Sequence, residues 1–136
     1  MIINLKQLAK LRILSYIYFA EKDLSIDTLE RELGIRRNFV DRILKEYILK
    51  GYVIENSPNR FATTEKGDNL TLYDFLDVSN FLYELEYLFV KKTTFDSVIE
   101  DGLKKIIEAI IFEASKTTLT KLKNQFEELE ADMFYL

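Results

Sequence analysis

The positions of the glycines and the proline constrain the fold of this chain more than any other sequence feature. There are only four glycines and one proline among 136 residues. Gly34 and Gly51 each follow a run with helical apolar spacing, and glycine is the residue that most readily ends a helix. Pro58 lies between two short runs of strand-forming residues, where proline favours a turn. The first half therefore predicts helices that end at Gly34 and Gly51, followed by a hairpin that turns at Pro58.

Apolar periodicity predicts the elements between these breaks. The predicted helices span 5–21, 26–33 and 37–50, and the predicted strands span 52–56 and 60–64. Ser25 stands where the second helix needs an N-cap residue. The side chains that the third helix is expected to bury are Val40, Ile43, Leu44, Tyr47 and Ile48. Three helices followed by a short hairpin predict a mainly α fold with a small β element.

The second half of the chain has helical patterns and no compelling further strand. Residues 70–90 are rich in Leu, Phe and Tyr on more than one face, which predicts a helix that is buried on two sides. Residues 91–94 are expected to connect it to a helix over 95–114. A final helix carries an apolar stripe at coiled-coil-like spacing, formed by Leu119, Leu122, Phe126, Leu129 and Met133. Since a domain formed by the first 68 residues does not need this stripe for its core, the stripe must be buried either on the helices over 70–114 of the same chain or on a partner's copy. We expect a partner chain to cover at least part of it.

The chain contains neither histidine nor cysteine. This removes the usual zinc ligands, the commonest general base and the usual partners of a nucleophile, so we expect no enzyme activity, no metal and no cofactor. The first ten residues include Asn4, Lys6 and Lys10 and lack the apolar core of a signal peptide. No segment has the run of about 18 uncharged residues that suggests a membrane span. These patterns predict a cytoplasmic protein without membrane contact.

Three stretches of the first half carry a shared pattern: the run over 24–35, the run over 40–54 that ends in Lys50-Gly51-Tyr52-Val53-Ile54, and the run over 61–67 that ends in Thr64-Glu65-Lys66-Gly67. Together they resemble the winged-helix regulators of bacteria and archaea, including the MarR-like, PadR-like and small archaeal groups, in which a helix-turn-helix is followed by this entry to the wing and this exit from it. The resemblance implies a winged helix-turn-helix DNA-binding domain over 1–68 and a helical dimerisation region over 69–136. It also implies a transcription regulator that binds double-stranded DNA as a homodimer. The chain departs from the pattern in its short wing and in Arg36, which stands where a Ser or Thr cap is commoner.

The distribution of charge supports a DNA-binding surface in the first half, although the whole chain has a net charge of −4. Residues 1–69 hold 12 basic and 10 acidic residues, while residues 70–136 hold 7 basic and 13 acidic ones. In a helix-turn-helix the second helix enters the major groove and its first residues meet base edges. The residues that we expect to contact DNA are Arg36, Arg37, Asn38, Arg42 and Lys45 on this helix and Asn59 and Arg60 at the wing tip.

Other interpretations remain open at the level of sequence. Winged helices also serve as protein-binding subunits of larger assemblies without DNA contact, and an acidic chain with a short wing fits that role. The aromatic residues Tyr73, Phe75, Phe81, Tyr83, Tyr87 and Phe89 could line a pocket for a small-molecule effector, but core or dimer packing is the simpler interpretation and no motif supports an effector. Asp74 and Asp77 have a spacing that is ordinary on a solvated helix, so a metal site is not expected there. The acidic residues of the last helix are interpreted as a solvated face; they are Glu127, Glu128, Glu130 and Asp132.

Overall fold

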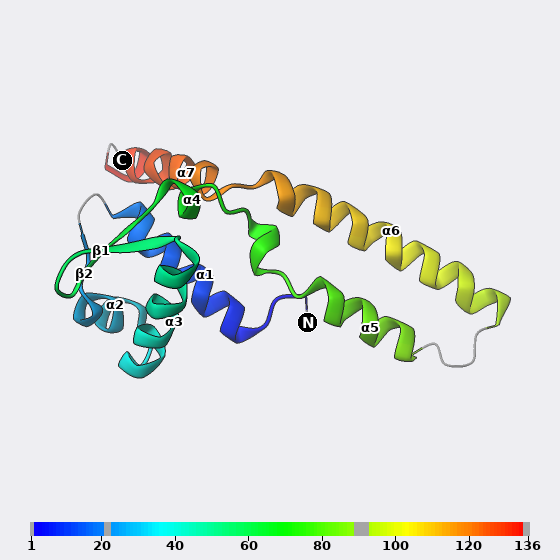
Figure 1. Ribbon diagram of the computed structural model, residues 1–136. Coiled ribbons are helices and arrows are strands. Elements are labelled where there is room, and N and C mark those ends of the chain that lie inside the picture. The colour runs from blue at the N-terminus through cyan, green and yellow to red at the C-terminus, as the bar shows by residue number, and fades with distance from the viewer. Residues whose placement is uncertain (1, 21–22, 89–92, 135–136) are drawn as a thin grey trace.

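The computed structural model describes residues 2–20, 23–88 and 93–134 (Figure 1). The first half contains α1 (Leu5–Phe19), α2 (Ile26–Leu33), α3 (Arg37–Lys50), β1 (Val53–Ser57), β2 (Arg60–Thr63) and the short α4 (Glu65–Asp68). The second half contains the 3-10 helix η1 (Leu72–Phe75), α5 (Val78–Leu88), α6 (Thr94–Lys116) and α7 (Leu119–Phe134). Three helices followed by an antiparallel hairpin form a winged helix, so the predicted fold class is confirmed.

The predicted boundaries of α2 and α3 are confirmed because local groups determine them, whereas α1 ends at Phe19 rather than at residue 21. The Ser25 hydroxyl accepts a hydrogen bond from the Thr28 amide and caps α2. Gly34 and Gly51 follow α2 and α3 with φ angles of 66° and 79°, in the left-handed region that glycine adopts without a side-chain clash. α3 begins after Arg36, whose side chain makes no capping hydrogen bond.

The hairpin differs slightly from the prediction. β1 starts at Val53 rather than at Tyr52, because the Tyr52 amide donates a hydrogen bond to the Tyr47 carbonyl and thereby closes the end of α3. The two strands pair Val53 with Thr63 and Ile54 with Ala62, and a register shift between Glu55 and Ser57 leads into the turn. The hairpin is tied to the helices by a two-way backbone bridge between Leu24 and Phe61.

The core of the first half lies between α1, α2, α3 and the hairpin. Its fully buried side chains include Ile13, Leu14, Leu29, Val40, Ile43, Leu44 and Val53. Tyr47 is also buried, as predicted, but Ile48 is 37% exposed. At 100° per residue, Ile48 lies at the edge of the face formed by the other predicted core residues of α3, so α1, α2 and β1 do not cover it.

The single helix predicted over 70–90 is wrong. Instead, the Leu72 amide donates a backbone hydrogen bond of 2.9 Å to the Thr117 carbonyl, and the Leu119 amide donates one of 3.0 Å to the Leu70 carbonyl, so this stretch is extended. η1 follows, and α5 begins only at Val78. Long-range pairing therefore overrides the local helical pattern.

The expected burial of this segment on two sides is also wrong for the side chains that the structure describes. Phe75 is buried, but Tyr73 is exposed and Tyr83 is 67% exposed. Phe89 and the predicted connection at Lys91 and Lys92 lie outside the described residues, as does the side chain of Tyr87. The described aromatic residues therefore do not form a single buried cluster.

The helices α5 and α6 form an arm that projects away from the winged helix (Figure 1). They meet through a small cluster in which Val78 and Ile107 are buried and Phe81, Leu82 and Ile111 are partly buried. α6 starts with a capping box formed by Thr93 and Asp96. The chain then returns, and α7 lies beside the winged helix rather than on the arm (Figure 1).

α7 packs on α1 of the same chain, which neither of the packing choices considered from sequence includes. Leu119 is fully buried in the core of the first half, and Leu122 packs against that core. The ring of Phe126 stacks on that of Phe19 with 5.1 Å between ring centroids. Leu129 and Met133 are 59% and 67% exposed. The expectation that the winged helix does not need this stripe is therefore wrong for the first half of the stripe.

Candidate nucleic-acid interface

The outer face of α3 carries the polar residues that the sequence analysis selected. Arg36, Arg37, Asn38, Arg42 and Lys45 are all exposed. The opposite face of the same helix buries Val40, Ile43, Leu44 and Tyr47. Packing of this apolar face holds α3 in place and orients its basic side chains towards solvent.

Two of these cations are already paired with acidic side chains. Arg37 at the start of α3 makes an ion pair with Asp27 on α2, and Lys45 lies 2.9 Å from the Asp41 carboxylate one turn earlier. Arg36 and Arg42 make no ion pair with any residue that the structure describes. The positive potential of this surface therefore comes mainly from Arg36 and Arg42.

The wing contributes one exposed cation and one structural residue. Arg60 opens β2 and is exposed. Asn59 has a φ of 62°, and its side-chain oxygen accepts a hydrogen bond of 3.2 Å from the Ile26 amide at the start of α2. Its own amide donates to the Glu55 carboxylate at 2.8 Å. Asn59 thus anchors the hairpin to α2, a role that its position in the turn did not reveal.

A groove of about 360 Å³ runs between α3 and the wing. It brings together three of the predicted site residues, Arg37, Lys45 and Asn59, and is also lined by Asp41 and Glu55. The other four predicted residues, Arg36, Asn38, Arg42 and Arg60, do not line it. The two acidic side chains make the groove unfavourable for a phosphate.

Sequence analysis missed Leu49, which is 88% exposed near the end of α3. It lies one turn after Lys45 on the face that also holds Asn38 and Arg42, at steps of four, three and four residues. That spacing was visible in the sequence, but apolar residues are usually assigned to the core. An exposed leucine on this face could contact an apolar group such as a thymine methyl.

Two acidic residues of the segment over 71–84 accept hydrogen bonds within that segment. The Asp74 carboxylate accepts hydrogen bonds from the Thr71 amide and hydroxyl and so forms the capping box of η1. Asn80 donates a hydrogen bond to Glu84. Within the described ranges no group of three or more acidic residues is arranged to hold a metal ion.

Comparison with known proteins supports the fold. The crystal structure of Staphylococcus aureus CymR is similar to this chain with a TM-score of 0.64, over 88% of this chain and 96% of that chain, at 9% sequence identity. A scan against protein-family models finds no match, and a search of curated proteins finds no similar sequence.

The class that fold and site define is therefore a winged-helix protein with a C-terminal helical extension. At 9% identity the similarity to CymR shows this fold and does not distinguish the MarR-like group from the PadR-like group. Among the helices of the described segments, none has the length and apolar character needed to cross a membrane.

Proposed function

We propose that this protein binds duplex DNA with α3 in the major groove and acts as a transcription regulator. The observation that carries the proposal is the exposed pair Arg36 and Arg42 on the second helix of a helix-turn-helix, with no ion pair to a described residue. An unpaired arginine at the start of α3 beside the exposed Asn38 matches what contacts to base edges require, and a second unpaired arginine further along the helix can reach a phosphate. The winged-helix fold supports the same proposal.

Each residue has a proposed role that follows from its chemistry and position. Arg36, Arg37 and Asn38 lie at the start of α3, where side chains meet base edges, and a good bidentate contact to guanine or adenine contributes about 1 to 3 kcal/mol of discrimination. Arg42, Lys45 and Arg60 are assigned to phosphates, where they increase affinity without sequence preference. Asp27 and Asp41 reduce non-specific attraction because they neutralise Arg37 and Lys45.

We also propose that the protein is a homodimer held together by α6. Phe95, Ile99, Leu103, Ile106 and Ile110 are exposed and recur at steps of four, four, three and four residues, so they form one continuous apolar stripe. The stripe lies beside the face that packs on α5, which is marked by the buried Ile107. A second copy of the same helix fits this surface because an isologous contact buries the same stripe on both chains. Two winged helices would then read two half-sites.

A second candidate function is a protein-binding subunit that does not contact DNA. It is favoured by the ion pairs of Arg37 and Lys45 and by the exposed Leu49, which leave the outer face of α3 less basic than the sequence implies. Binding to duplex DNA decides between the two functions, because only the first predicts salt-sensitive association.

The test compares two variants that each lose two positive charges. Arg36→Ala with Arg42→Ala removes the unpaired cations of α3, while Lys105→Ala with Lys121→Ala removes exposed cations of α6 and α7. Duplexes selected from a random pool and random duplexes are titrated at about 50 and 200 mM salt. We expect the α3 variant to bind at least about tenfold more weakly, roughly 1.4 kcal/mol, and the control to bind as the wild type does. Association that is absent or independent of salt would favour the protein-binding function.

A further inference from the structure

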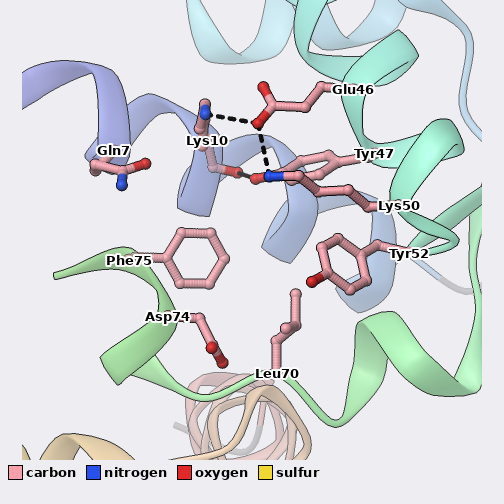
Figure 2. A pocket seen from close by; sticks show the side chains of 9 residues that line it. All are labelled: Gln7, Lys10, Glu46, Tyr47, Lys50, Tyr52, Leu70, Asp74 and Phe75. Atoms are coloured by element: carbon pink, nitrogen blue, oxygen red, sulfur yellow. Dashed lines mark hydrogen bonds and ion pairs between the residues drawn. The ribbon is translucent and has the colours of Figure 1, made fainter.

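A polar cavity of about 140 Å³ lies at the end of α3 that is remote from the proposed base contacts (Figure 2). Its walls come from α1, from the last turn of α3, from Tyr52 and from the segment over 70–75 that leads to the arm. The residues that determine its chemistry are Lys10, Glu46 and Lys50 on one side and Asp74 on the other (Figure 2). None of them belongs to the proposed DNA contacts.

One side of the cavity has an excess of positive charge. The ammonium groups of Lys10 and Lys50 each lie 2.9 Å from the same oxygen of Glu46, so two cations share one carboxylate. Hydrogen bonds from Lys50 and Lys10 lower the pKa of Glu46 and keep it ionised at neutral pH. The Lys10 side chain is only 15% exposed, and the Tyr47 hydroxyl donates a hydrogen bond of 2.8 Å to the Lys10 carbonyl. Packing therefore holds Lys10 in place, whereas Lys50 is 53% exposed and is positioned by its ion pair with Glu46.

The other side of the cavity carries a negative charge and apolar surface. Asp74 is fixed by its hydrogen bonds to Thr71, which use one of its two carboxylate oxygens. Figure 2 shows Asp74 across the cavity from Lys50, with the ring of Phe75 and the side chain of Leu70 beside it and the Tyr52 hydroxyl directed inward. The Tyr52 hydroxyl, the Asp74 carboxylate and the ammonium groups of Lys10 and Lys50 thus surround one small space.

We propose that this cavity binds a small zwitterion of the size of a simple amino acid, with its carboxylate at Lys50 and its ammonium group at Asp74. A simple anion would face Glu46 and Asp74, and a simple cation would face two lysines, so only a ligand with both charges matches both sides. A protein cavity of about 150 Å³ holds benzene, which has six heavy atoms, and glycine, alanine and serine have about that size. The Tyr52 hydroxyl supplies a further hydrogen bond to the carboxylate.

Such a ligand would contact the last turn of α3 and η1 at the same time. The Leu72 amide of η1 donates a backbone hydrogen bond to the carbonyl of Thr117, the residue after α6, so the site lies where the arm meets the winged helix. The binding proposal itself does not depend on DNA, and its test uses the protein without DNA.

The experiment is calorimetric titration of the full chain with glycine, L-alanine, L-serine and β-alanine at concentrations up to about 10 mM. Acetate and methylammonium, which each carry one of the two charges, are the matched ligand controls. We expect at least one of the zwitterions to bind and both controls to fail. Binding of acetate as strong as that of the zwitterions, or binding of none of the zwitterions, would overturn the proposal.

Variants then locate the site. Asp74→Asn keeps an oxygen that can cap η1 but removes the charge, and Lys50→Met removes one ammonium group; each should weaken zwitterion binding at least about tenfold because each deletes one charge contact. Asp132→Asn and Lys121→Met on α7 are the matched controls and should bind as the wild type does. Thermal unfolding shows whether each variant is folded. Folded Asp74→Asn and Lys50→Met variants that bind with unchanged affinity would contradict this assignment of the site.

Discussion

Gly67 occupies a position where the backbone leaves no room for a side chain. A β-carbon built on Gly67 would lie 2.3 Å from the Tyr52 carbonyl oxygen, far inside van der Waals contact. The same carbonyl accepts a hydrogen bond of 3.0 Å from the Thr64 amide, and the Thr64 hydroxyl accepts one of 3.1 Å from the Gly67 amide. Position 67 at the end of the Thr64-Glu65-Lys66-Gly67 sequence therefore requires glycine for a steric reason. The chain turns back there against the backbone of Tyr52, just after the end of α3.

This contact predicts different effects of the same substitution at two glycines. Gly67→Ala should lower the free energy of unfolding by about 2 kcal/mol or more, because a backbone atom cannot move aside cheaply. Gly102→Ala should raise it by about 0.5 to 1 kcal/mol, because no atom apart from the backbone of its own helix and its chain neighbours lies within 4 Å of the new methyl group and alanine favours a helix interior. Urea denaturation followed by circular dichroism measures both effects. Equal stability of the two variants would show that the approach to Tyr52 is not close in solution.

Single residues also show which features of the site could be predicted from the sequence and which could not. The exposed face of α3 could be predicted, because alternation of apolar and polar residues along one helix is local information. The ion pair between Arg37 and Asp27 joins two helices, and the hydrogen bond from the Ile26 amide to Asn59 joins a helix to the wing tip. Such contacts depend on how elements pack, so composition and spacing could not reveal that Arg37 is partly neutralised or that Asn59 has a structural role.

The elements show the same distinction between local and long-range information. α2 and α3 have the predicted boundaries, since their caps and glycine ends are encoded within a few residues of each helix. The segment over 70–77 and the packing of α7 were predicted less well, because the pairing of Leu70 with Leu119 joins residues that are far apart in sequence. That pairing brings α7 back to α1 and places Leu119 in the core of the winged helix.

Substitutions at the two ends of the apolar stripe of α7 should therefore change the free energy of unfolding by different amounts. Leu119→Ala should lower the free energy of unfolding by about 2 to 5 kcal/mol, because a fully buried leucine leaves a cavity. Leu129→Ala lies on the same stripe but is 59% exposed, and its effect should stay within about 0.5 kcal/mol. Thermal unfolding of both variants at equal concentration measures the difference. A large loss at Leu129 together with a small one at Leu119 would place the main contact of α7 on a partner chain.

The proposed DNA-binding surface and the proposed dimer surface lie in different parts of the molecule. α3 lies on one side of the winged helix, α7 lies on another, and the arm of α5 and α6 projects away from both (Figure 1). The last part of α7 carries Glu127, Glu128, Glu130 and Asp132 without a basic residue between them, so pairing of two copies through this part would bring like charges together. α6 carries the longer exposed apolar stripe, which makes it the surface that we expect a second copy to cover.

A pair of variants with equal exposure tests this assembly. Ile106 and Phe112 are both 59% exposed on α6, but at 100° per residue their side chains lie about 120° apart, and only Ile106 belongs to the stripe. Ile106→Glu should shift the protein from dimer to monomer in sedimentation velocity, because burying two unpaired carboxylates at a two-fold contact is costly. The same variant should weaken binding to a DNA duplex with two half-sites and leave binding to a single half-site nearly unchanged. Phe112→Glu should remain a dimer, since the new carboxylate faces solvent near Lys116, whose ammonium group lies 3.7 Å from the Phe112 ring centroid. If Ile106→Glu sediments as the wild type does while circular dichroism shows the native helix content, α6 is not the contact between the two copies.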